Sequence, residues 1–125
     1  MKSTFDLSKE EMKAYGYKII DILVEHFDTL ESKQPVHTAS REKMDRIFLQ
    51  EAPDKATSAD EVLDFVMKNV MPYAALTSHP KSYSFVPGPS NYISTLADTL
   101  ATGFNIFSGG WVGSPAAAEL EIVTM

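Results

Sequence analysis

The sequence of 125 residues contains no cysteine. That absence excludes a disulfide framework, a thiolate metal site and a cysteine nucleophile together. Histidine is scarce as well: His26, His37 and His79 stand far apart, without the spacing of a zinc site. We therefore expect no metal centre in this chain.

Basic residues and long apolar runs are also few. Lys and Arg number 11 against 17 Asp and Glu, a net charge of −6. Binding to a phosphate backbone needs clustered cations, and the densest basic cluster, Arg41, Lys43 and Arg46, is interrupted by Glu42 and Asp45. No segment approaches the roughly 20 apolar residues that span a bilayer, and no signal peptide opens the sequence. We expect a cytoplasmic protein with neither a nucleic-acid nor a membrane partner.

The composition that remains is globular, with 44% hydrophobic and 22% charged residues. Ser8 and Glu11 form a capping box, which predicts the start of a long helix that ends before Pro35. This helix packs its wide apolar face either within its own domain or across a subunit boundary, and the periodicity leaves both open. The apolar positions recur three and four residues apart, at Met12, Tyr15, Ile19, Leu23, Phe27 and Leu30.

Similar signals predict two more helices in the first half of the sequence. One is expected over residues 40–50. A second capping box, Ser58 with Glu61, opens the next helix, which Asn69 and Pro72 end. The fold class is therefore mainly α, with little or no regular sheet.

The second half combines helices with irregular apolar segments. Ser90 or Asn91 is expected to cap a helix that ends near Gly103, and Ser114 followed by Pro115 opens another. This last helix meets no stop signal, so we expect the chain to be part of a longer protein. Two irregular stretches remain: an extended segment with a rigid turn, Tyr83, Phe85, Val86 and Pro87-Gly88-Pro89, and an apolar glycine-rich loop over residues 104–113 that should be covered by other protein surface.

Residues 79–121 resemble the N-terminal region of the group II amino-acid decarboxylases, which depend on pyridoxal phosphate (PLP). The aromatic-type enzymes and their bacterial relatives are the nearest branch. The first seventy residues fit the family's N-terminal helices more loosely. The landmarks match in order and spacing: His79-Pro80, Tyr83-Ser84-Phe85-Val86-Pro87, Ser90-Asn91-Tyr92, Leu96-Ala97-Asp98, Trp111, Ser114-Pro115 and Glu119-Leu120-Glu121.

The resemblance implies an N-terminal helical layer of a PLP-dependent transferase fold of the aspartate-aminotransferase type (type I), whose α/β large domain is missing from this chain. Residues 1–75 would be dimer-wrapping helices, residues 76–113 a substrate-loop region with one helix, and residues 114–125 the start of a helix leading into the large domain. The implied activity is release of carbon dioxide from an L-amino acid, aromatic by the branch that matches. The implied partner is a second copy, in a homodimer formed through the N-terminal helices.

The resemblance also assigns substrate-binding residues, while the PLP contacts and catalytic residues would lie outside this segment. Gly88 stands beside the substrate carboxylate, where aromatic-type relatives often carry threonine, so the identity of the amino acid stays open. Phe107 would reach the partner's active site and contact an aromatic substrate, with extra room at Gly109. His79 is expected to be structural. The assigned residues are Phe85, Val86, Pro87, Gly88, Phe107 and Gly109.

Plainer interpretations of the same residues remain open. The aromatic side chains could be ordinary core residues, and the proline-rich turn could serve rigidity alone. The chain could also be a stand-alone helical module that self-associates or binds a partner without catalysis. In either case we expect the isolated chain to be inactive as an enzyme and at least dimeric, with the first or the last helix buried between subunits.

Overall fold

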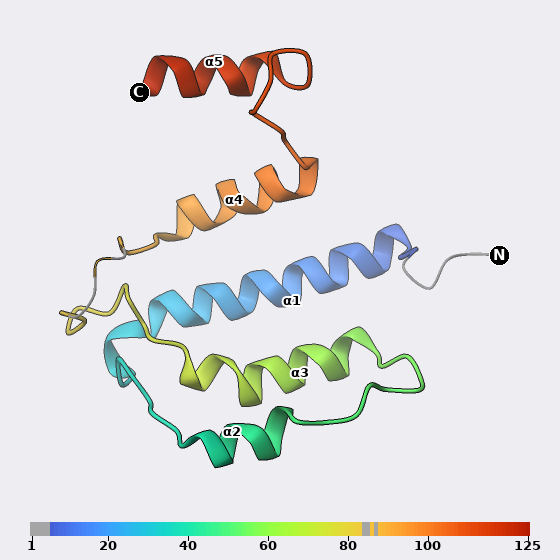
Figure 1. The fold of residues 1–125 in the computed structure, drawn as a ribbon, viewed down its shortest axis with the longest axis vertical. Helices are drawn as coiled ribbons and strands as arrows, with labels where there is room; N and C mark the ends of the chain where they lie inside the picture. Colours follow the sequence, from blue (N-terminus) through green and yellow to red (C-terminus); the bar gives the residue numbers. More distant parts are fainter. Residues whose placement is uncertain (1–5, 84–85, 87) are drawn as a thin grey trace. The chain divides into compact units, whose positions relative to one another are not determined.

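A computed structural model describes residues 6–83, 86 and 88–125, and all regular structure in these residues is helical (Figure 1). This confirms the prediction of a mainly α chain. The chain forms two compact units, Met1–Pro89 and Ser90–Met125. No helix in the described part is both long and apolar enough to cross a bilayer. The elements are α1 (Lys9–Asp28), η1 (Leu30–Ser32), α2 (Arg41–Phe48), α3 (Ala59–Asn69), η2 (Met71–Tyr73), α4 (Tyr92–Phe104) and α5 (Pro115–Thr124), where η marks a 3-10 helix.

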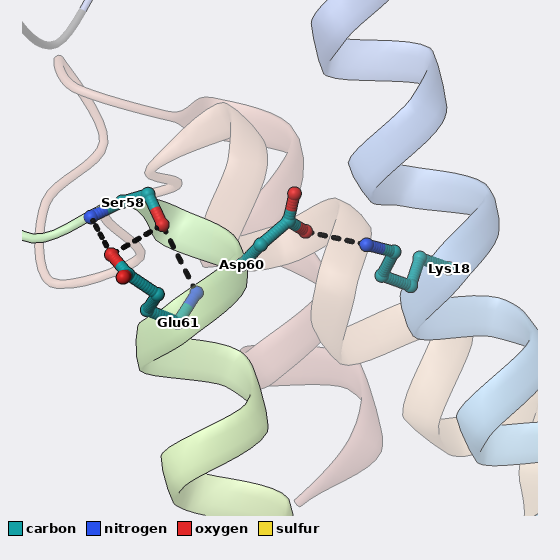
Figure 2. A network of polar contacts seen from close by, with 4 residues as sticks. All are labelled: Lys18, Ser58, Asp60 and Glu61. Carbon is teal, nitrogen blue, oxygen red and sulfur yellow. Dashed lines mark hydrogen bonds and ion pairs between the residues drawn. The ribbon is translucent and has the colours of Figure 1, made fainter.

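Side-chain caps define the starts of the helices in the first unit, as the sequence predicts. At α1 the Glu11 N–H donates to Ser8 Oγ (3.2 Å) and the Ser8 N–H donates to Glu11 Oε2 (2.7 Å). The Ser58 and Glu61 pair closes the same reciprocal box at α3 (Figure 2). Ser40 caps α2 through a single bond. Each bond satisfies a backbone donor that the helix itself leaves free.

The helices of the second unit differ in detail from the expectation. Asn91, rather than Ser90, caps α4, and the helix continues past Gly103 to end at Phe104. The left-handed residue that ends it is Asn105, with φ of 48°; asparagine tolerates this conformation better than most residues. Ser114 precedes α5 as predicted, but its side chain makes no capping bond.

Aromatic and backbone contacts join the elements of the first unit, where α3 lies between α1 and α2 (Figure 1). The rings of Phe48 on α2 and Phe65 on α3 meet edge to face, with centroids 5.9 Å apart. The Leu76 N–H donates to the carbonyl oxygen of Pro35 (2.8 Å), which ties the segment after η2 to the segment after η1. These contacts make residues far apart in sequence neighbours in space.

An ion pair also links α1 to α3, between Lys18 and Asp60 (Figure 2). The hydrogen bond to Asp60 raises the pKa of the Lys18 ammonium group. Both side chains keep about half of their surface exposed, and exposed pairs of this kind contribute little to stability. The pair therefore helps to orient the two helices, while the stability of their packing must come from apolar contact.

That apolar contact is limited in each unit. Leu30, 7% exposed, and Ala118, 8% exposed, are the buried apolar residues of the described chain. Along α1 the side chains of Met12 and Ile19 are exposed, although they belong to the predicted apolar face. The face is thus only partly covered within its own unit.

A groove runs between α1 and α3 on the first unit, formed by two adjoining cavities of about 300 and 410 Å³. We call it the α1–α3 groove. Most of its lining is apolar. Six residues line both cavities: Ile22, His26, Met67, Met71, Ala74 and Leu76.

His26 is a titratable group that faces this groove. Partial burial lowers the pKa of its imidazole, and the nearby positive charge of Lys33 lowers it further. Lys33 is held close by a hydrogen bond from its Nζ to the His26 carbonyl oxygen (3.4 Å). Both effects favour the neutral form of the imidazole.

We predict that Ser58→Ala destabilises α3, because it removes the Oγ that accepts from the Glu61 N–H and donates to Glu61 Oε2. The backbone N–H of residue 58 keeps its bond to the Glu61 carboxylate. The loss in unfolding free energy should be about 1 kcal/mol, measured by urea unfolding followed by circular dichroism. Ser114→Ala is the matched control, since Ser114 makes no side-chain capping bond. Equal losses in the two variants would contradict the assigned role of the Ser58 cap.

We also predict that His26 titrates below the ordinary histidine value of 6.5. An NMR titration of the histidine ring protons measures the midpoint directly. Lys33→Met should raise that midpoint by removing the neighbouring charge, and the remaining shift reports the burial. A His26 midpoint at or above 6.5 in the unmodified chain would show that the groove does not shield the ring.

Candidate functional site

The first group of candidate residues, 85–88, is described only in part. Phe85 and Pro87 lie outside the described residues. Val86 is 98% exposed, and a Cβ atom placed on Gly88 would meet no atom within 4 Å. Neither described residue is held by packing, so their assignment to substrate binding stays a prediction.

The segment just before this group is fixed by a buried histidine. His79 is 4% exposed. Its backbone N–H donates to the Leu76 carbonyl oxygen (3.0 Å) and its carbonyl accepts from the Ser82 N–H (2.8 Å). Its Nδ1 accepts from the Lys81 N–H (3.0 Å), while Nε2 finds no hydrogen-bond partner among the described residues. The ring is part of a tight turn, in agreement with the structural role expected of it.

The second group of candidates lies in the loop between α4 and α5, which is attached at both ends. At its start Asn105 adopts the left-handed conformation, and the Ile106 N–H donates to the Ala101 carbonyl oxygen of α4 (3.3 Å). At its end the Gly113 N–H donates to the Gly110 carbonyl oxygen (3.2 Å). The backbone between these bonds has a defined path within the second unit.

Phe107 lies over the glycines of this loop. A Cβ atom placed on Gly109 would lie 2.6 Å from Cζ and 2.9 Å from Cε2 of the ring. One placed on Gly113 would lie 3.3 Å from Cδ1. The side chain nevertheless remains 67% exposed, so one side of the ring contacts the glycines and the rest is open.

These contacts change the expectation for Gly109. Sequence reasoning placed extra room there, and the structure shows that the Phe107 ring occupies the space beside its Cα. Sequence reasoning also missed Gly113. The signal was present, because an aromatic residue is followed by three glycines within six positions, and glycine is suited to close approach by other groups.

Apolar side chains around the loop remain uncovered. Together these exposed side chains form an apolar patch, and a patch of this kind is typical of a contact site for other protein. Besides Phe107, four residues keep more than half of their surface exposed: Phe104, Ile106, Trp111 and Val112.

Metal ions and PLP each require particular side chains close together. The described residues contain no group of three His, Asp or Glu side chains that could hold a metal. A PLP site needs a lysine free to form a Schiff base and a partner for the pyridine nitrogen. Lys33, the one lysine that lines the α1–α3 groove in the described chain, donates its Nζ to a backbone carbonyl, and most of the remaining lining is apolar. The groove therefore does not fit PLP.

Comparison with known proteins relates the whole chain to aromatic-amino-acid enzymes. No family model matches it. The aromatic-L-amino-acid decarboxylase of Bacillus atrophaeus is 33% identical over 125 residues, which is all of this chain and 26% of that protein. The phenylacetaldehyde synthase of Arabidopsis thaliana is 26% identical over 95% of this chain and 24% of its own length. The chain thus spans about a quarter of the curated relatives it matches.

Solved structures show the same fold. The tryptophan decarboxylase of Catharanthus roseus in complex with L-tryptophan superposes with a TM-score of 0.76 and 26% identity, over 94% of this chain and 25% of that one. The Oryza sativa TDC with PLP and tryptamine gives a TM-score of 0.82 over 97% of this chain and 25% of that one, at 19% identity. The identity in the second case is low, so that match supports the fold alone. Taken together, these findings confirm that the chain resembles, over its full length, a helical segment of the PLP-dependent group II amino-acid decarboxylases.

Proposed function

We propose that the protein to which this chain belongs is a PLP-dependent L-amino-acid decarboxylase, a carboxy-lyase that converts an aromatic amino acid to an amine and carbon dioxide. The observation that carries the proposal is the 33% identity to an aromatic-L-amino-acid decarboxylase across all 125 residues. The superposition on a tryptophan decarboxylase in complex with L-tryptophan supports the substrate class.

In this proposal the chain supplies dimer contacts and cover for the substrate. Residues 1–75 wrap the second subunit, residues 76–113 form the substrate-loop region, and residues 114–125 lead into the large domain. The exposed apolar side chains of α1 and the α1–α3 groove support the first assignment, because they offer apolar surface that is unburied within this unit. The exposed loop around Phe107 supports the second.

The chemistry is divided between this segment and the rest of the protein. PLP, held outside these 125 residues, supplies the electron sink for the carbanion that remains when carbon dioxide leaves. The candidate substrate residues of this chain carry no titratable side chain, so their proposed part is to bind, orient and keep water out. They are Phe85, Val86, Pro87, Gly88, Phe107 and Gly109.

A stand-alone helical module is the second candidate. The capped helices would suit it, because each cap adds local stability to its helix. The small number of buried apolar residues speaks against it, because an independent domain buries far more. The match along the whole chain to decarboxylases favours the enzyme.

We predict that the native full-length protein, supplied with PLP, converts an aromatic L-amino acid to its amine. The measurement follows amine and carbon dioxide with L-tryptophan, L-tyrosine and L-phenylalanine, alongside the intact mass of the native protein. The same assay on the 125-residue chain alone should give no product. An aldehyde in place of the amine would reassign the reaction to the type named by the phenylacetaldehyde synthase relative.

We also predict that the native protein is a homodimer that depends on the exposed face of α1. Ile19→Asp should raise the dimer dissociation constant about tenfold to a hundredfold, because a side chain of this size loses its burial and a carboxylate takes its place. Sedimentation equilibrium measures the change. Lys13→Asp, also exposed on α1, is the matched control, and a monomeric native protein would contradict the proposal.

A further inference from the structure

The glycines of the loop between α4 and α5 are not required by the backbone. No positive φ occurs at a glycine in the described part of the chain, so residues with side chains could adopt the same conformation at Gly109 and Gly113. The usual reason for glycine in a loop, access to the left-handed region, does not apply here. The left-handed position of the loop belongs to Asn105 instead.

These glycines matter because they leave space for the Phe107 ring. A Cβ atom on Gly109 would fall 2.6 Å from the Phe107 ring, and one on Gly113 would fall 3.3 Å from it. By contrast, a Cβ atom on Gly16 or Gly103 would meet nothing within 4 Å. The close approach of the ring is therefore particular to this loop.

Backbone hydrogen bonds near both ends of the loop also restrict the path of the chain that carries the ring. The Ile106 N–H bonds back to Ala101 in α4, and the turn from Gly110 to Gly113 leads directly into Ser114 before α5. With the backbone attached at both ends, the position of the Phe107 ring depends on what stands beneath it.

We infer that Gly109 and Gly113 are positioning residues. Because they lack side chains, the Phe107 ring can lie against the loop, and this position selects the substrate side chains that the ring can contact. The inference rests on the proposed function, in which Phe107 contacts the substrate. A side chain at residue 109 would push the far end of the ring outward. Because the atoms displaced lie at the end of a rotatable side chain, the ring can turn away at little cost in stability.

The two glycines should differ in the size of their effect. At Gly109 the clash involves Cζ and Cε2 at distances that no real Cβ contact tolerates, so the ring must move. At Gly113 the nearest atom, Cδ1, would be 3.3 Å away and needs to shift by only a few tenths of an ångström. Gly109→Ala should therefore change specificity more than Gly113→Ala.

The test measures kcat and KM of the native full-length protein with L-tryptophan and L-phenylalanine, which differ in ring size. Gly109→Ala should change the ratio of the two kcat/KM values by about tenfold, since a misplacement of about 1 Å can cost about a hundredfold in rate and only part of that loss is shared by the two substrates. Gly103→Ala, on α4 with open space around it, should leave the ratio unchanged. Thermal unfolding of the Gly109→Ala and Gly103→Ala variants should be alike.

A double-mutant cycle distinguishes positioning from a general structural effect. In a Phe107→Ala background the ring is absent, so adding Gly109→Ala should have no further effect on the ratio. Additive effects, or an unchanged ratio in the single variant Gly109→Ala, would overturn the inference.

Failure of the proposed function would be seen separately. A wild-type protein that releases carbon dioxide from no aromatic amino acid refutes the proposed activity and, with it, the role in specificity. The position of the ring would then be judged by the NMR shifts of the Gly109 and Gly113 amides, which respond to the ring current of Phe107. If Phe107→Leu leaves these shifts unchanged, the contact itself is refuted.

Discussion

Bonds between side chains and free backbone N–H groups at the helix starts are the interactions on which this structure depends most. The boxes that open α1, α3 and α4 each satisfy donors that the helix cannot pair internally. In an ordinary domain such caps supplement a core. Here the described residues include only two buried apolar side chains, Leu30 and Ala118, so the definition of the helices falls largely on local bonds. The apolar side chains left exposed on α1 and around Phe107 are surface available for further packing.

This dependence on local bonds explains why much of the fold could be predicted. Ser8 with Glu11 and Ser58 with Glu61 are signals contained in four consecutive residues, and the structure confirms both. The predicted end of α4 was less accurate. Glycine favours the end of a helix, which pointed to Gly103, but the residue that adopts the left-handed conformation is Asn105. Ser114 does precede α5 as predicted, but its side chain does not make the expected capping hydrogen bond. A cap can be located by residue type, but its hydrogen bond depends on the angle at which the chain enters the helix.

The candidate site was harder to predict, for a different physical reason. Phe107 and Gly109 were named from a family resemblance, yet their mutual contact could not be read from the sequence. Which way an aromatic ring turns in an irregular loop depends on backbone angles, and no periodic pattern reports these. The same holds for the α1–α3 groove, where His26 and Lys33 become neighbours only because the chain turns back after α1. Local sequence signals predict where the helices lie. Contacts between helices, or between a helix and the loop that follows it, can be seen only in the folded structure.

The backbone of the glycine-rich loop has a consequence for how this protein can change. A residue that requires a left-handed conformation is constrained by folding, and most replacements there are lost because the chain no longer folds. Gly109 has no such constraint, since its conformation is open to any L-amino acid and only a neighbouring ring occupies the space. A replacement at this position therefore meets a rotatable side chain and no opposition from the backbone. Over evolutionary time such a glycine is easier to exchange than one that a left-handed turn demands.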